Sequence, residues 1–169
     1  NGRWAKHRGL PRIAGHERGA KTVREIVTHC ARLGIEALTL YSFSTDNWKR
    51  PQNEVDFLME LYAQYLIAER TTIMENNVRF IHVGKREGLP QPVLTEMDGT
   101  VELSRCNTGL KLCLALNYGS REEIVEACRK LARRVEAGEM TASGITESEI
   151  SRALYTAGLP DPDLLIRTA

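Results

Sequence analysis

The chain has 169 residues, with 42% hydrophobic and 27% charged side chains and a formal net charge of +1. These values are typical of a globular protein and exclude a disordered or collagen-like chain. No apolar run approaches the roughly 18 residues that a membrane-spanning helix needs, and no signal-peptide pattern is present. The sequence therefore predicts a soluble, cytoplasmic protein of one domain over residues 1–169.

Helical and extended patterns alternate along the chain. Apolar residues recur at helical spacing over 17–33, where Gly34 is placed to end the helix, and a long helix is expected over 54–76 with Asn53 as its cap. Further helices are predicted over 92–104, 120–137 and from residue 146, and strands are predicted over 36–43, 78–83, 110–116 and 163–168.

Two of the predicted helices begin with a capping box, in which a hydroxyl and a glutamate three residues later bond each other's backbone N–H groups. The pairs are Ser120 with Glu123 and Thr146 with Glu149. The alternation of helix and strand predicts an α/β fold with a mostly parallel central sheet flanked by helices. Ligands bind such sheets beyond the carboxyl ends of the strands.

The four cysteines stand too far apart for the paired spacing of a zinc knuckle. Each lies among apolar or helical neighbours, which favours buried, reduced thiols over disulfide bonds or a metal site. They are Cys30, Cys106, Cys113 and Cys128.

The first 24 residues are strongly basic. They carry a net charge of +6, which leaves −5 on the other 145 residues. A basic end on an acidic body suggests an anionic partner, although a solvated basic face explains the charge equally well. Nucleic acid is one candidate partner, but Trp4 is the only aromatic residue in the segment and no nucleic-acid-binding motif is present.

The opening residues combine a flexible backbone with cations. Gly2 lets a backbone N–H approach an oxyanion closely, and Arg3 offers a bidentate grip. Arg12, Gly15 and His16 precede the predicted helix, whose amino end favours a phosphate. These residues predict a diphosphate cradle, with an ordinary solvated loop as the alternative because the spacing matches no known phosphate-binding motif.

A polar loop over 44–50 follows the first predicted strand and holds hydroxyls, an acid, an amide, a tryptophan and an arginine. This mixture is typical of a site; the alternative is a turn in which Asp46 and Asn47 bond the backbone while Trp48 packs. The long helix that follows is apolar on more than one face, which fits a ligand cleft, a dimer surface or core packing. No zinc-protease motif, nucleophile elbow or other activated nucleophile is found, so covalent catalysis is not expected.

Together these residues resemble the cis-prenyltransferase family, whose bacterial type member is undecaprenyl diphosphate synthase. The matching strings occur in the family's order along essentially the whole chain. They are residues 1–6, Arg12 with Gly15 and His16, and residues 41–51, 107–109, 117–119 and 163–168.

The resemblance implies an Mg²⁺-dependent enzyme that condenses isopentenyl diphosphate with an allylic diphosphate, usually farnesyl diphosphate, to make new cis double bonds. The product would be a cis-polyprenyl diphosphate such as undecaprenyl diphosphate, the lipid carrier precursor for cell-wall peptidoglycan. It also implies an apolar tunnel between sheet and helices for the growing chain, a homodimer, peripheral contact with the membrane that receives the product, and no nucleic-acid partner.

The resemblance also assigns roles to residues. Asn47 would be catalytic; since a neutral amide is a very weak base, we expect it to orient the substrate or a water while a diphosphate oxygen takes the proton. Arg167 would grip isopentenyl diphosphate, and Trp4 would lie beside the allylic chain. The substrate-binding set implied is Asn1, Gly2, Arg3, Trp4, Arg12, His16, Ser44, Thr45, Asp46, Trp48, Arg50 and Arg167.

The chain departs from the family pattern in three ways. The family's catalytic aspartate stands two positions before the match to Asn1, and the family continues beyond residue 168 with a metal-binding glutamate and a dimer-forming segment. Position 46 is Asp where the family usually has Glu. We therefore expect an excerpt of a longer enzyme with no metal ligand among these residues.

Three other readings remain open. One is a non-catalytic, diphosphate-binding partner subunit of the same superfamily, although such subunits typically lose the Arg-Trp and Ser-to-Arg residues kept here. The others are an unrelated nucleic-acid-binding module and a phosphate-binding regulatory domain.

Overall fold

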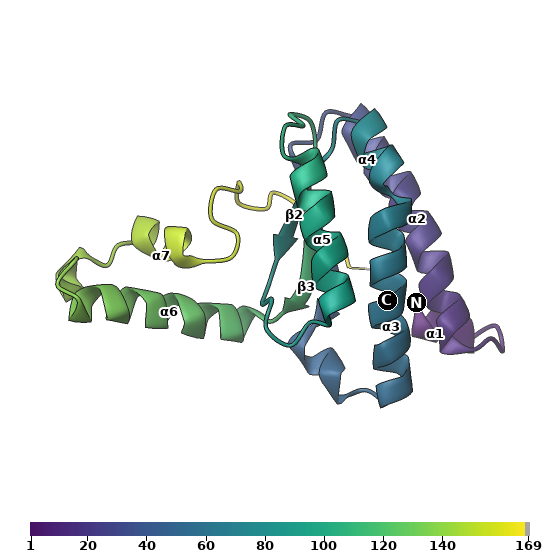
Figure 1. The fold of residues 1–169 in the computed structure, drawn as a ribbon, viewed down its shortest axis with the longest axis horizontal. Helices are drawn as coiled ribbons and strands as arrows, with labels where there is room; N and C mark the ends of the chain where they lie inside the picture. The colour runs from purple at the N-terminus through teal and green to yellow at the C-terminus, as the bar shows by residue number, and fades with distance from the viewer. Residues whose placement is uncertain (168–169) are drawn as a thin grey trace. The chain divides into compact units, whose positions relative to one another are not determined.

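The computed structural model describes residues 1–167, which fall into two compact units, Asn1–Asn117 and the part that begins at Tyr118 (Figure 1). The first unit contains α1 (Gly2–Lys6), α2 (Arg12–Arg32), β1 (Ala37–Ser44), the 3₁₀ turn η1 (Thr45–Lys49), α3 (Gln52–Ala68), α4 (Arg70–Glu75), β2 (Arg79–Val83), α5 (Gln91–Ser104) and β3 (Lys111–Tyr118), whose last residue opens the second unit. The second unit contains α6 (Ser120–Glu136), η2 (Ala142–Gly144) and α7 (Glu147–Ala153).

The first unit is built on a sheet of three strands among the described residues, in the order β1-β3-β2. Strands β2 and β3 run parallel, with Arg79 opposite Lys111 and Val83 opposite Ala115. Helix α5 packs against β2 and against α3, so helices cover the sheet (Figure 1). The predicted α/β class with a parallel sheet is confirmed.

The core of the first unit lies between the sheet and α3 and α5. Most of the apolar residues of α3 that the sequence spread over several faces are buried or half-buried in this core, which explains them by packing alone. The expected apolar tunnel stays a prediction. The core includes Phe43, Val55, Leu58, Met59, Leu66, Val93, Met97 and Leu116.

The predicted helix over 17–33 begins five residues earlier than expected, directly after Pro11, and ends as expected before Gly34, whose φ is +70°. The long helix predicted over 54–76 is divided into α3 and α4 at Glu69. Asn53 does not cap this helix, because α3 has already begun at Gln52 and the Asn53 side-chain oxygen accepts the N–H of the next residue.

Two asparagines with positive φ shape the turns around β2 and β3. Asn77, with φ +52°, precedes β2; its side chain accepts the N–H of Thr108 at 3.0 Å and donates to that residue's hydroxyl at 3.1 Å. A Cβ on Gly109 would lie 2.5 Å from the carbonyl oxygen of Asn77, so only glycine fits there. Thr108 and Gly109, which belong to one of the matching family motifs, therefore stabilise this turn.

In the second unit the expected capping box at Ser120 is wrong. The Glu123 carboxylate is buried and accepts the Tyr118 hydroxyl at 2.6 Å and the Tyr155 N–H at 2.7 Å, so it cannot turn back to the helix start. At α7 the box is confirmed in part, because the Thr146 hydroxyl accepts the N–H of Glu149 at 3.3 Å.

Two further expectations need correction. The strand predicted over 163–168 is not formed over 163–167, where the chain has no regular structure, and residue 168 lies outside the described residues. All four cysteines are free thiols as predicted, but the predicted burial is wrong for two of them: Cys106 is exposed in a turn, and Cys128 is exposed on α6.

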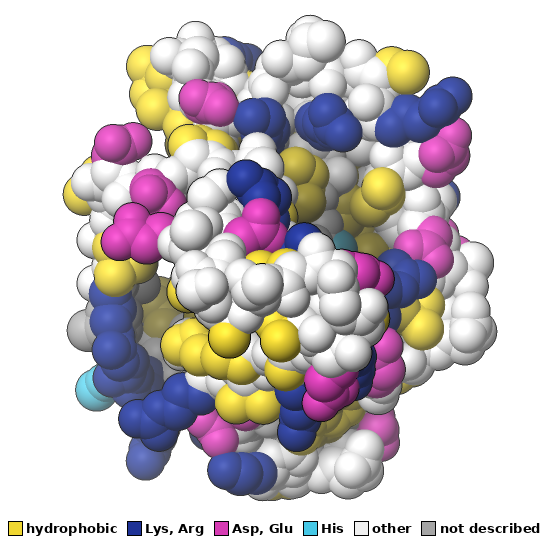
Figure 2. All heavy atoms as spheres, turned by 90° about the vertical axis from the view of Figure 1, so that its left-hand side faces the viewer, with side chains coloured by type: hydrophobic (Ala, Val, Ile, Leu, Met, Phe, Trp, Pro, Cys, Tyr) yellow, Lys and Arg dark blue, Asp and Glu magenta, His cyan; other side chains and the backbone are white. Residues whose placement is uncertain are grey.

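Figure 2 shows charged side chains of both signs interspersed on one face of the molecule. Within residues 1–167, no helix is long and apolar enough to cross a membrane.

Candidate functional site

The carboxylate of Glu54, in the first turn of α3, is the meeting point of three side chains from two other segments. Its Oε1 accepts Arg50 Nη1–H at 3.0 Å and lies 3.5 Å from His16 Nε2. Its Oε2 lies 3.3 Å from Arg12 Nε. The sequence singled out Arg12 and His16 together and Arg50 in a different loop. Glu54, which it did not single out, brings these three residues together.

Burial sets the electrostatics of this cluster. The side chains of His16 and Glu54 are only 12% and 11% exposed, whereas that of Arg12 is 60% exposed and reaches into solvent. Burial lowers the pKa of His16, and the Glu54 carboxylate partly opposes this shift. At 3.5 Å the two groups are too far apart for a good hydrogen bond, and Nε2 has no hydrogen-bond partner among the described residues. A buried ring nitrogen without a partner is uncommon in a folded protein, which makes His16 a candidate for a functional role.

The lowered pKa of His16 gives the stability a defined pH dependence. The unfolded chain takes up this proton near the ordinary pKa of 6.5, before the folded protein does, so stability should fall as the pH is lowered through 6.5 and be regained above it. Burial lowers the pKa of His82 in the same direction. Urea unfolding between pH 8 and 5 should show a weaker pH dependence in His16→Asn, and a still weaker one when His82→Asn is added. An unchanged slope in both variants would contradict this account.

Glycines on α1 and α2 allow the two helices to approach closely. A Cβ on Gly2 would lie 3.1 Å from Arg12 Nε, so the guanidinium covers this glycine. A Cβ on Gly15 would lie 2.2 Å from the carbonyl oxygen of Asn1, and one on Gly19 would lie 2.5 Å from the Asn1 side-chain nitrogen. The opening residues therefore depend on two glycines one helical turn apart.

We expect Gly15→Ala to raise the KM for the allylic diphosphate that the family resemblance predicts as substrate at least about tenfold, because a backbone oxygen cannot yield to the new methyl group and α1 must move away from Arg12. The same change in an unobstructed helix stabilises by about 1 kcal/mol. Gly144→Ala, at the end of the 3₁₀ turn η2, is the control for adding a methyl group without a clash, since its Cβ would meet nothing nearer than 3.4 Å. Steady-state kinetics and thermal unfolding of both variants test this, and wild-type kinetics in Gly15→Ala would refute it.

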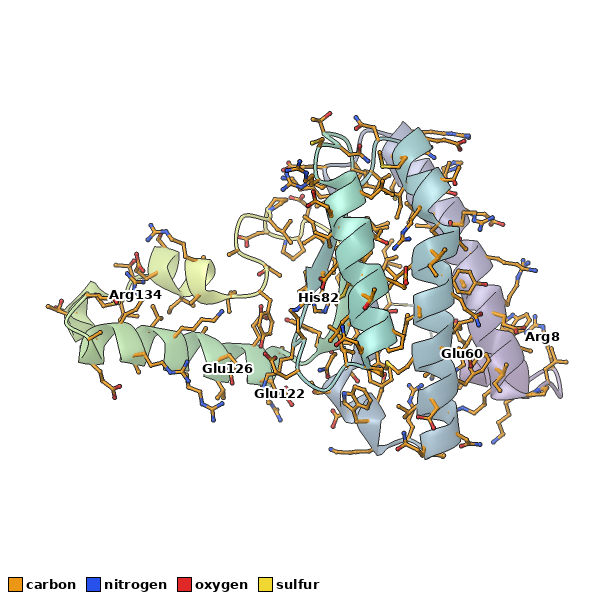
Figure 3. The ribbon with its side chains drawn as sticks, in the orientation of Figure 1. Arg8, Glu60, His82, Glu122, Glu126 and Arg134 are labelled. Atoms are coloured by element: carbon orange, nitrogen blue, oxygen red, sulfur yellow. The ribbon has the colours of Figure 1, made fainter. Side chains whose placement is uncertain are left out.

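A groove of about 400 Å³ lies beside this cluster and carries three cations. No acidic side chain is among its lining residues, so it is suited to an anion. It is lined by Gly2, Arg3, Lys6, Gly9, Leu10, Pro11 and Arg12. The opening string is helical rather than the flexible turn that was expected, and it contributes to the groove from α1. Arg8, labelled in Figure 3, lies 4.4 Å from the ring of Trp4 in a cation–π contact.

The polar loop over 44–50 forms the 3₁₀ turn η1, closed by a reciprocal cap. Asn47 Oδ1 accepts the N–H of Ser44 at 3.1 Å, and the Ser44 side chain accepts the N–H of Asn47. The asparagine oxygen is therefore occupied, while its NH₂ group has no acceptor among the described residues. Asp46 pairs with Lys49 at 2.7 Å, but both side chains are about 80% exposed, so this pair contributes little stability.

Trp48 packs edge-on against Phe43, with the ring centroids 5.0 Å apart. The tryptophan therefore packs, and Asn47 bonds the backbone, as the plainer interpretation of the loop expected. Arg50 at the end of the same turn nevertheless reaches the Glu54 cluster, which links the loop to α2. Arg167 is exposed and belongs to the second unit. Its role, like the individual roles of the other predicted site residues, stays a prediction.

Comparison with known proteins decides the family. The prenyltransferase family model, described as undecaprenyl diphosphate synthase, matches residues 1–169. The chain belongs to this family. Isoprenyl transferases of Rhodopirellula baltica and Shouchella clausii are 51% and 52% identical over 99% and 100% of the chain, which spans 69% and 66% of their own lengths.

Solved structures agree with this family assignment. Lavandulyl diphosphate synthase from Lavandula x intermedia, in complex with dimethylallyl diphosphate, matches 91% of this prenyltransferase chain and 66% of its own, with 34% identity and a TM-score of 0.89. A probable undecaprenyl diphosphate synthase from Campylobacter jejuni matches 82% and 64%, with 32% identity and a TM-score of 0.70. The family expected from the sequence motifs is confirmed.

Proposed function

We propose that the protein containing this chain is a cis-prenyltransferase that condenses isopentenyl diphosphate with an allylic diphosphate, farnesyl diphosphate in the first instance. The product is a cis-polyprenyl diphosphate such as undecaprenyl diphosphate, which is delivered to the membrane. Many relatives bear the name isoprenyl transferase, and one related structure holds an allylic diphosphate. The same family background supports a homodimer.

The main support for this proposal is that Arg12, His16 and Arg50 converge on Glu54, and that Arg12 also lines a groove that presents Arg3 and Lys6. The groove is suited to an allylic diphosphate, whose oxygens Arg3 and Arg12 bind as paired hydrogen-bond donors. His16 Nε2 supplies one further contact to an oxygen. Charge neutralisation by these groups makes the diphosphate a better leaving group.

The reaction breaks the allylic carbon–oxygen bond, forms a carbon–carbon bond from the alkene of isopentenyl diphosphate, and releases one proton. Asn47 is a donor in this scheme, because its oxygen already accepts the Ser44 N–H and its NH₂ group is left to orient the incoming diphosphate or a water. The proton passes to a diphosphate oxygen. Arg167 binds isopentenyl diphosphate, and Trp4 lies along the allylic chain.

Magnesium is proposed as cofactor from the family and from diphosphate chemistry, since hard oxygen ligands and retained waters suit this ion. Residues 1–167 hold no cluster of three or more His, Cys, Asp or Glu side chains that could bind a metal. Both oxygens of Glu54 are engaged by Arg12, His16 and Arg50.

The test is incorporation of labelled isopentenyl diphosphate into a lipid-soluble product by the complete protein, with farnesyl diphosphate and Mg²⁺. We expect a polyprenyl product that disappears with a chelator and forms at least about a hundredfold more slowly in Asn47→Ala, and its length assigns the subtype. A folded protein that binds diphosphate but makes no product would instead be a non-catalytic partner subunit.

A further inference from the structure

The indole of Trp48 is held by a side chain far away in the sequence. Its Nε1–H donates to Oδ1 of Asn117 at 2.7 Å, across 69 residues. Trp48 lies in η1 directly after Asn47, and Asn117 lies near the end of β3. The bond therefore joins the carboxyl end of a central strand to the turn that carries the proposed condensation residues.

Asn117 is itself rigidly anchored. It is 4% exposed, and its φ of +55° is one that asparagine tolerates better than most residues. Its side-chain nitrogen donates to the carbonyl oxygens of Lys85 and Glu87 at 3.2 and 2.9 Å, and its own carbonyl oxygen accepts the Lys85 N–H at 3.1 Å. Every polar atom of the asparagine amide is used, so Oδ1 is presented to Trp48 in a fixed direction.

This anchoring matters because ring packing alone does not orient an indole. The contact of Trp48 with Phe43 is edge-to-face at 75°, and a phenylalanine could make it as well. The hydrogen bond to Asn117 selects the orientation of the indole, and the ring in turn holds η1 between Asn47 and Arg50.

We infer that Asn117 is a positioning residue, which holds Trp48 and through it the η1 turn in the geometry that condensation requires. The inference rests on the proposed function, because it assigns a further residue to the same reaction. Asn117 need not touch either substrate.

The first experiment replaces Asn117 by glycine in the complete protein. Asn117→Gly keeps the positive φ available and removes the buried side chain together with its hydrogen bonds to Trp48, Lys85 and Glu87. We expect kcat to fall about tenfold while the KM for farnesyl diphosphate stays at the wild-type value, since the Glu54 cluster is untouched. In a background that keeps Trp48 as its single tryptophan, with Trp4 and any tryptophan outside residues 1–169 replaced by phenylalanine, the fluorescence emission maximum of Trp48 should shift. Trp48→Phe should lower kcat to a similar extent, and the double variant should be no slower than either single variant.

Asn77→Gly is the matched control. Asn77 is the other described non-glycine residue with positive φ, and its side chain also bonds a neighbouring loop, but it has no bond to Trp48. We expect this variant to lose thermal stability and to keep kcat and the Trp48 emission.

The outcomes separate the positioning role of Asn117 from the proposed function. Wild-type kcat and emission in Asn117→Gly would overturn the positioning role, and so would losses that multiply in the double variant. If the wild-type protein itself makes no product, the proposed function fails. The Trp48 emission then decides on positioning, because an unshifted maximum in Asn117→Gly excludes it.

Discussion

Glu54→Gln is expected to lower kcat/KM about a hundredfold, the scale of loss that accompanies misplacement of groups around a reacting centre by about 1 Å. The carboxylate offers two oxygens to Arg12, His16 and Arg50. A glutamine offers one oxygen and no charge, so two guanidinium groups lose their common counterion. Glu54→Asp should give an intermediate loss, because the shorter side chain cannot reach all three partners.

Glu60→Gln is the matched control for this effect. Glu60 lies on the same helix, is exposed, and contacts Gln64 at 3.3 Å (Figure 3). Its replacement removes the same charge and should leave steady-state kinetics at the wild-type level. If both variants retain full activity with labelled isopentenyl diphosphate, Glu54 does not organise the site.

Asn47→Asp distinguishes a donor from a base. The aspartate keeps an oxygen for the Ser44 N–H, so η1 is preserved, but it replaces the NH₂ donor by a much stronger base. If the NH₂ group orients the substrate, kcat should fall by a factor of about 100 to 1000, as on losing one oriented donor, and Asn47→Ala, which also loses the oxygen bound by the Ser44 N–H, should be at least as slow. Activity equal to or above wild type would show that residue 47 accepts the proton.

The same chemical change at Asn53 is the control. This exposed asparagine accepts the next residue's N–H through its side-chain oxygen at 3.0 Å, and Asn53→Asp keeps that bond. A carboxylate is well tolerated in the first turn of a helix. Its kcat should equal that of the wild type, measured in the same assay.

The sequence predicted correctly those elements that depend on residues close together in the chain. The strands around Phe43, Phe80 and Leu114 were found because short runs of apolar residues between turn residues have few other uses. The end of α2 followed from Gly34. The Ser120 capping box failed because a partner 32 residues away, the Tyr155 N–H, takes the carboxylate that the local motif required. No local pattern contains such a competitor.

The same reason explains the candidate site. Arg12, His16 and Arg50 were singled out by type and by family resemblance, but Glu54 was not, because two of its three partners are 42 and 38 residues away in the sequence. The one available signal was its spacing of four residues from Arg50 on a helix start. Surface pairs with that spacing are common, so the pattern does not distinguish a structural carboxylate from an ordinary one.

The two asparagines with positive φ also bear on how the sheet finds its pairing. Five of the eight residues of β3 are buried, and they lie on both faces of the strand, so alternation of polar and apolar residues cannot tell one register from the next. Asn77 lies just before β2, and its side chain bonds Thr108, which lies just before β3. Asn117 lies near the end of β3, and its side chain bonds Lys85 and Glu87 in the loop after β2. The pair of strands is thus locked at both ends by amide side chains. A shift of the pairing by one residue would break the hydrogen bonds of both asparagines at once. The loss of these bonds disfavours the wrong register, which the pattern of apolar residues does not do.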